Sequence, residues 1–76
     1  MIDSIPHRSF LILSDVHEVK TDGKPMFLSV VGVQPNFGGA PIRIPGALPS
    51  PTRKEALTCG QDAGKRWINR WLGPEA

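Results

Sequence analysis

Residues 52–72 read TRKEALTCGQDAGKRWINRWL, and this stretch decides the fold because both ends of a helix are encoded in it. Thr52, followed three residues later by Glu55, forms a capping box in which each side chain satisfies a backbone N–H of the first turn. At the other end, Gly73 can adopt the left-handed conformation that closes a helix, and Pro74 lacks the N–H needed to continue it. The sequence therefore predicts one long helix between these two signals.

The predicted helix, residues 53–72, has one broad apolar face and one polar face. At 100° per residue the apolar face holds Ala56, Leu57, Cys59, Gly60, Ala63, Gly64, Trp67, Ile68, Trp71 and Leu72. The middle of this face is small, and a glycine inside a helix costs about 0.8–1.0 kcal/mol relative to alanine. Close packing explains such residues, either against the protein's own sheet, which we favour, or against a second helix in a dimer.

The chain before the helix predicts a β-hairpin. Residues 9–20 and 26–33 are rich in Phe, Leu, Ile and Val, and they flank residues 21–25, a connector that contains an Asp-Gly step. A third strand is expected over residues 40–44. Pro41 confines it to a sheet edge, because proline has no N–H to donate to a strand ladder.

An extended connector, residues 45–51, leads from the third strand to the helix, since proline and glycine are frequent there. The elements together predict a single domain over residues 1–76. Its class is α+β: a small three-stranded, mainly antiparallel sheet packed against one long C-terminal helix.

The predicted sheet has apolar residues on both faces, whereas one helix covers only one face. Successive side chains of a strand alternate between faces. One set in the second strand is therefore Met26, Leu28 and Val30, and the other is Phe27, Ser29, Val31 and Val33. Neither set is clearly polar, so the pattern does not say which one faces the helix. A homodimer would cover the remaining face, with Phe27, Val31 and Trp71 as candidate interface residues.

The size of the chain also favours self-association. At 76 residues it lies near the limit of roughly 70–80 residues at which a single core gives little net stability. Cys59 is the only cysteine, so no intrachain disulfide can form. The chain begins without a basic segment followed by a long apolar run, and no run of about 18 apolar residues occurs. We expect a cytoplasmic protein with no membrane partner.

Positive charge is concentrated in the predicted helix. The formal net charge is only +2, but residues 53–72 hold five basic residues against two acidic ones. The basic residues, which are candidate contacts to nucleic acid or to an acidic partner, are Arg53, Lys54, Lys65, Arg66 and Arg70. The alternative is a solvated flank on which Asp62 pairs with Arg66.

A catalytic, metal or phosphate-binding site has little support in the sequence. Asp15 and His17 share a strand face, and Cys59 could act as a thiol nucleophile, but Cys59 is not at the helix start that would activate it. His7, placed in a loop before the sheet, could join His17 and Asp15 around a metal only with a further ligand that is missing. Gly38-Gly39 lacks the Lys-Ser/Thr of a phosphate-binding loop. We expect no enzyme activity, no catalytic residue, no cofactor and no metal.

The motif Thr52-x-x-Glu55-Ala56-x-x-x-Gly60-x-x-Ala63-Gly64-x-x-Trp67-Ile68-Asn69, preceded by a hairpin, resembles the C-terminal helix of small uncharacterised proteobacterial proteins of sheet-then-helix build. The motif covers about a quarter of the chain, and the resemblance implies a fold and no function. A sheet followed by a basic helix is also similar to the second half of double-stranded-RNA-binding domains. The first helix of that fold and its dense lysine cluster are missing here.

Three hypotheses about function follow from the sequence. The first is a non-enzymatic, cytoplasmic protein-interaction or accessory module, which uses apolar sheet surface or the segment from Pro35 to Pro51. The second is a small nucleic-acid-binding module that uses the basic flank of the helix. The third and weakest is a minimal enzyme built on Cys59 and His17.

Overall fold

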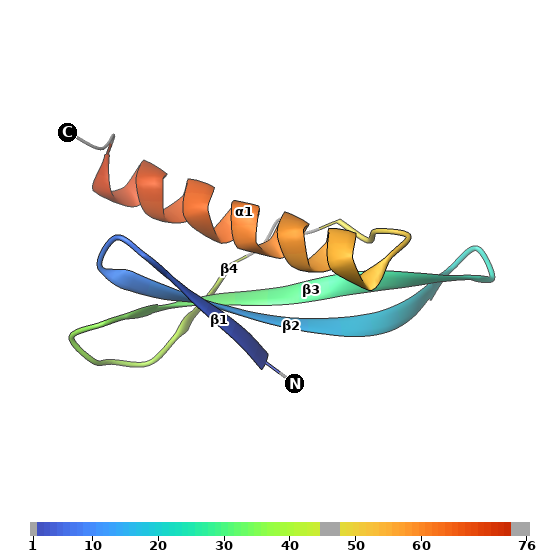
Figure 1. The fold of residues 1–76 in the computed structure, drawn as a ribbon, viewed down its shortest axis with the longest axis horizontal. Coiled ribbons are helices and arrows are strands. Elements are labelled where there is room, and N and C mark those ends of the chain that lie inside the picture. Colours follow the sequence, from blue (N-terminus) through green and yellow to red (C-terminus); the bar gives the residue numbers. More distant parts are fainter. Residues whose placement is uncertain (1, 45–47, 74–76) are drawn as a thin grey trace.

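The computed structural model describes residues 2–44 and 48–73 as one antiparallel sheet with one helix lying on it (Figure 1). The strands are β1 (Ile2–His7), β2 (Phe10–Thr21), β3 (Lys24–Pro35) and β4 (Ile42–Ile44), and they lie in the order β1-β2-β3-β4. The helix α1 (Arg53–Leu72) packs mainly on β2 and β3. The α+β class predicted from the sequence is confirmed.

Strand β1 corrects the prediction of three strands, because residues 2–7 form a fourth strand and His7 is not in a loop. The pairs run from Ile2 opposite Asp15 to His7 opposite Phe10. Pro6 is tolerated because β1 is an edge strand, where a missing N–H need not break the ladder. The polar residues of β1 give a weak local signal, so pairing with β2 is what makes this segment a strand.

The hairpin of β2 and β3 is longer than predicted, and its turn is shorter. Thr21 pairs with Lys24, which leaves a two-residue turn in place of the five-residue connector. Both turn residues, Asp22 and Gly23, have positive φ angles of 52° and 77°. Asp-Gly is well suited to such a turn, whose twist matches the twist of the strands on either side. Strand β4 begins at Ile42, two residues later than predicted.

Helix α1 has the predicted bounds. The hydroxyl of Thr52 accepts a hydrogen bond from the backbone N–H of Glu55 at 3.1 Å, and Gly73 follows the last turn with a φ of 84°. Pro74 and residues 45–47 of the predicted connector lie outside the described residues. No helix in the described part of the chain is long and apolar enough to cross a bilayer.

The core lies between α1 and one face of the sheet. Its buried apolar side chains are Phe10, Ile12, Val31, Val33, Ile44 and Ile68, with Ile5 and Trp67 packed beside them. On the helix, the buried residues are Ala56, Gly60, Ala63, Gly64 and Ile68. The small residues of the helix therefore face the sheet, as the sequence predicted, and do not form an exposed seam for a second helix.

Two contacts show how closely the helix approaches the sheet. A Cβ atom built on Gly60 would collide with the Ser29 hydroxyl oxygen and lie 2.7 Å from the Ser29 Cβ. A Cβ atom on Gly64 would lie 2.7 Å from a methyl group of Ile12. Real Cβ atoms do not approach other atoms so closely, so glycine is required at both positions. Ser29 and Ser14, both buried, have hydroxyl groups without a hydrogen-bond partner among residues 2–44 and 48–73.

The helix is also fixed at both ends. At its start, the guanidinium group of Arg53 lies 5.0 Å from the centre of the Phe27 ring. At its end, Arg8 in the β1–β2 turn donates a hydrogen bond to the carbonyl of Gly73 at 2.7 Å. His7 Nε2 is 3.0 Å from the amide oxygen of Asn69. These contacts keep α1 aligned along the sheet.

The substitution Gly60→Ala tests the close approach of helix and sheet. Alanine gains about 1 kcal/mol of helix propensity, but its Cβ would collide with Ser29, so we expect a net loss of about 1–3 kcal/mol in the free energy of unfolding. Urea unfolding followed by circular dichroism measures it. Thr58→Ala, on the exposed side of the same helix, is the control and should change stability by less than about 0.5 kcal/mol. A Gly60→Ala variant at least as stable as the unmodified protein would contradict the packing described here.

Candidate interaction surface on the open sheet face

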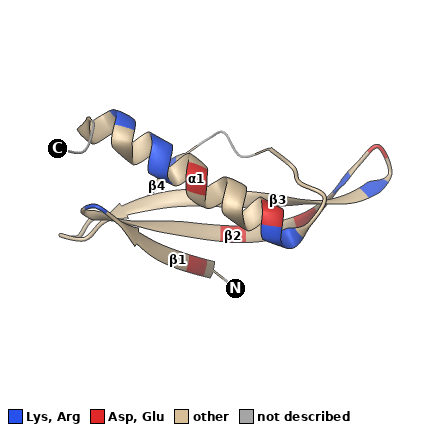
Figure 2. Cartoon of the chain, turned by 45° about the horizontal axis from the view of Figure 1, so that its top comes forward, with Lys and Arg blue, Asp and Glu red and all other residues tan. Residues whose placement is uncertain are grey.

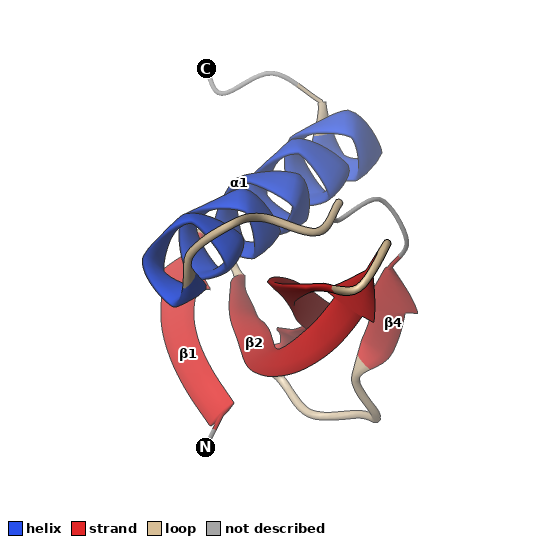
Figure 3. Ribbon diagram, turned by 90° about the vertical axis from the view of Figure 1, so that its right-hand side faces the viewer, coloured by secondary structure: helices blue, strands red, loops and turns tan. Residues whose placement is uncertain are grey.

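The face of the sheet turned away from α1 is the strongest candidate for a functional surface. We call it the open face, because no helix or strand among residues 2–44 and 48–73 packs on it (Figure 3). The pairing of the strands shows which residues belong to this face. Val31 and Ser29 contact the helix side, so Val30 and Leu28 of β3 point to the open face. Directly paired residues share a face, which places their partners in β2, Asp15 and His17, there as well.

The open face is mostly apolar. Its apolar members are Ile2, Pro6, Leu11, Leu13, Val19, Met26, Leu28 and Val30. Ile2 is 62% exposed, and the outward residues of the central strands β2 and β3 are mostly half-buried by their neighbours in the sheet. Their outer ends remain in contact with water, because side chains stand out from the plane of a sheet. The second apolar face that the sequence suggested is therefore present and uncovered by regular structure.

A hollow lies on the open face where β3 carries Gly32, which has no side chain. Its volume is about 240 Å³, and its lining includes Leu13 and Val30 from the central strands and Pro41 from the β3–β4 loop. Asp15 and Arg43, of opposite charge, border it. The hollow thus combines an apolar floor with a polar rim, which is the usual anatomy of a site for an apolar side chain.

The polar residues of the open face include one close pair. His17 Nε2 lies 3.0 Å from a carboxylate oxygen of Asp15, and both side chains are partly exposed. Cys59 belongs to α1, on the opposite side of the sheet. The sheet therefore separates the thiol from His17, and the Cys59–His17 arrangement considered as a minimal enzyme is not formed.

The possible metal ligands His7, His17 and Asp15 do not come together either. His7 lies on the helix side, where it contacts Asn69, whereas His17 lies on the open face. In the described part of the chain no group of three or more His, Cys, Asp or Glu residues is arranged to hold a metal ion.

Two of the three candidate interface residues are on the covered face. Val31 is 2% exposed beneath the helix, so it is not available to a partner, and this part of the prediction is wrong. Phe27 also faces the helix side, where Arg53 lies over its ring and Ser50 pairs with its backbone. The outward residues are their sequence neighbours, Leu28 and Val30. The sequence predicts that the side chains of this strand alternate between the two faces, but it does not predict which of the two alternating sets faces the helix.

Trp71, the third candidate, is 69% exposed at the end of α1. Its ring stacks on Trp67 with centroids 6.1 Å apart and meets the edge of Phe10 at 6.5 Å. One side of the ring is therefore used within the domain, and the remainder is accessible. It lies at the end of the molecule, away from the centre of the open face.

The basic residues of α1 are spread along the helix and do not form one block (Figure 2). Arg53 is engaged with Phe27 and donates to the carbonyl of Val16, while Arg70 is exposed in the last turn. Lys54 and Arg66 line a surface groove of about 430 Å³ together with Glu55, Thr58, Cys59 and Asp62.

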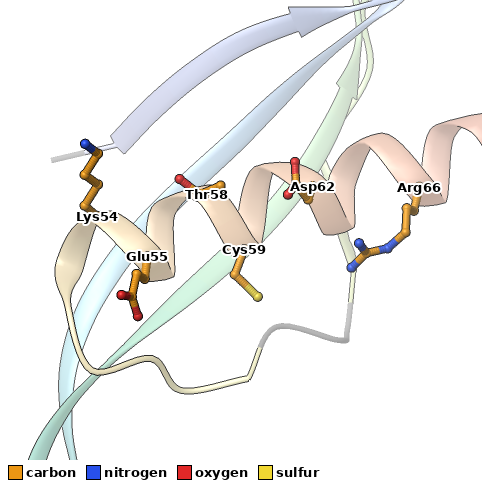
Figure 4. A pocket seen from close by; sticks show the side chains of 6 residues that line it. All are labelled: Lys54, Glu55, Thr58, Cys59, Asp62 and Arg66. Atoms are coloured by element: carbon orange, nitrogen blue, oxygen red, sulfur yellow. The ribbon is translucent and has the colours of Figure 1, made fainter.

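This groove follows the outer ridge of the helix and is not enclosed. In Figure 4 the side chains of Glu55, Cys59 and Arg66 point to one side of the ridge, and those of Lys54, Thr58 and Asp62 to the other. Two acidic and two basic groups line the groove, so no single sign of charge dominates it. Neither a phosphate nor a cation is favoured there over the other.

Comparison with protein-family models, with curated proteins and with solved structures gives no match to this chain.

Charged substitutions at adjacent positions test the assignment of the two faces. Val31→Lys places an uncompensated charge in the core, and we expect it to cost about 3–5 kcal/mol in the free energy of unfolding. Val30→Lys keeps its charge in water and should cost less than about 1 kcal/mol at low protein concentration. Thermal and urea unfolding of both variants measures the difference. Equal losses, or a larger loss at Val30, would contradict the assignment.

Proposed function

We propose that the protein is a non-enzymatic interaction module whose open face binds a protein surface. The observation that carries this proposal is the row of apolar side chains on β2 and β3 that no helix or strand in the described part of the chain covers. The sheet has apolar residues on both faces, but α1 covers only one. Contiguous exposed apolar surface of this kind costs solubility and marks interaction sites in small domains.

The arrangement of polar groups supports binding over catalysis. The only thiol and the Asp15–His17 pair are on opposite sides of the sheet. The hollow over Gly32 instead offers an apolar floor and two rim charges, Asp15 and Arg43, which could orient a partner. A cytoplasmic location goes with this proposal, because an unpaired thiol such as Cys59 persists in a reducing compartment.

Site-specific photo-crosslinking in the cells that produce the protein tests this function. A benzoylphenylalanine at position 28, on the open face, is expected to give a covalent adduct with a partner. The same group at position 58, on the outer side of α1, is the control and should not. The adduct from position 28 should disappear when Val30→Glu is added. Absence of any adduct from position 28 would reject the proposal.

Nucleic-acid binding is the second candidate, and the end of α1 is the observation that favours it. Arg66 and Arg70 are exposed on the same half of the helix as the exposed ring of Trp71. Cations beside an accessible aromatic ring are the groups that bind phosphates and stack on bases in single strands. The acidic residues of α1, Glu55 and Asp62, weaken the positive potential of the helix.

This second candidate predicts a strong dependence on salt. Fluorescence anisotropy with labelled single-stranded DNA, duplex DNA and RNA should show affinity that falls steeply from low to near-physiological salt. The double variant Arg66→Gln, Arg70→Gln should bind more weakly, with a salt slope reduced by about 1–2. Lys24→Gln, at the distant hairpin turn, serves as the control for net charge. Absence of binding at low salt, or binding that does not change with salt, would exclude this mechanism.

A further inference from the structure

We infer that the open face is covered by a second copy of the same chain, so that two sheets pack face to face in a two-fold symmetric dimer. This inference rests on the proposed function and specifies its partner. It is argued from the area of the face, its distribution of charge, its shape and the small size of the core.

The area of the open face is close to the lower limit for a stable dimer. Its residues are Ile2, Ser4 and Pro6 from β1, Leu11, Leu13, Asp15, His17, Val19 and Thr21 from β2, Lys24, Met26, Leu28, Val30, Gly32 and Gln34 from β3, and Arg43 from β4. With strands about 4.8 Å apart and side chains repeating every 6.6 Å along one face, the patch covers roughly 500 Å² in plan. Its accessible area is larger because the side chains stand up from the sheet. Two such patches approach the lower end of about 1,200–2,000 Å² buried in total by stable complexes.

The charge of the open face permits contact with itself. Asp15 carries a negative group, Arg43 and, at the hairpin end, Lys24 carry positive groups, and His17 lies 3.0 Å from Asp15. A two-fold interface brings the same patch of both subunits together, so a strongly charged face would repel its copy. A nearly neutral face with an acidic and a basic group beside one hollow avoids this repulsion. It also allows each charge to meet one of opposite sign in the second subunit.

The shape of the face supports the same partner. The hollow over Gly32 is a depression of about 240 Å³, and rows of leucine and valine side chains project beside it. In a two-fold symmetric dimer, the projecting apolar side chains of each subunit can enter the hollow of the other subunit. Sheets packed in this way lie about 10 Å apart, with the inner side chains of both interleaved.

The single subunit is thin and has a small core. It measures 43 × 23 × 17 Å, and its radius of gyration is 12.9 Å, above the value of about 11 Å expected for a compact domain of this length. Its apolar core has eight buried side chains in the described residues, and two of them are alanines. Small domains without disulfides or structural metals commonly gain stability through oligomerisation. A second sheet would turn the two-layer subunit into a helix–sheet–sheet–helix assembly with a second apolar layer.

The oligomeric mass of the purified 76-residue chain tests this inference. Sedimentation equilibrium over micromolar concentrations should give twice the mass of the 8.3 kDa chain. Val30→Glu and Leu13→Glu should each raise the dimer dissociation constant roughly 100-fold or more, because two carboxylates per dimer would be buried without partners. Thr58→Glu, the same charge placed on the exposed side of α1, should leave the dimer unchanged. Circular dichroism should show the same helix content in all three variants.

Two results would overturn the inference. One is a mass of 8.3 kDa at every concentration, and the other is a dimer that both Val30→Glu and Leu13→Glu leave intact. Crosslinking from position 28 separates this failure from failure of the proposed function. An adduct of twice the chain mass supports the dimer. An adduct with a different protein, abolished by Val30→Glu, overturns the dimer but leaves the interaction module standing. A monomer that gives no adduct rejects both.

Discussion

The close contact of α1 with the sheet at Gly60 and Gly64 is the constraint on which the rest of this structure depends. At Gly60 the helix backbone rests against Ser29, and at Gly64 it rests against Ile12, at distances that leave no room for a Cβ atom. At Gly60 the facing strand side chain is the small Ser29, whereas at Gly64 it is Ile12, whose methyl group lies against the helix. The buried hydroxyl groups of Ser29 and of Ser14 on the same face have no hydrogen-bond partner among the described residues. An unpaired buried hydroxyl group costs free energy, which the close packing of helix and sheet must offset.

This contact determines which face of the sheet is covered, and therefore which face is open. Side chains alternate along β3, so seating the helix on Ser29 and Val31 turns Leu28 and Val30 outward. A shift of one residue would exchange the two sets. The contacts at the ends of the helix, between Arg53 and Phe27 and between Arg8 and Gly73, hold the same alignment over the whole length of the domain. The open face is thus a consequence of the core and not a separate feature.

The sheet also decides what chemistry is available. It places the thiol of Cys59 on the helix side and the Asp15–His17 pair on the open face, so these groups cannot act together. What remains on the open face is apolar surface, one hollow and two rim charges. These features are the basis of the proposal that the face binds another protein, since binding depends on excluded water and matched shape. The basic residues of α1 offer a second surface, although acidic residues lie among them.

The sequence by itself determined the helix, because its capping residue, its apolar periodicity and its terminal glycine all act within the segment. It also determined the central hairpin and the α+β class, since the Asp-Gly turn and the two apolar runs are local signals. Tertiary structure decided the rest. Residues 2–7 form strand β1 because they pair with the backbone of β2, and no pattern within these residues predicts that pairing. The outward set of β3 depends on where the helix sits, because both alternating sets are apolar. The small residues Gly60 and Gly64 are consistent with packing on the strand residues that include Ser29. The contact itself, however, is seen only in the folded structure.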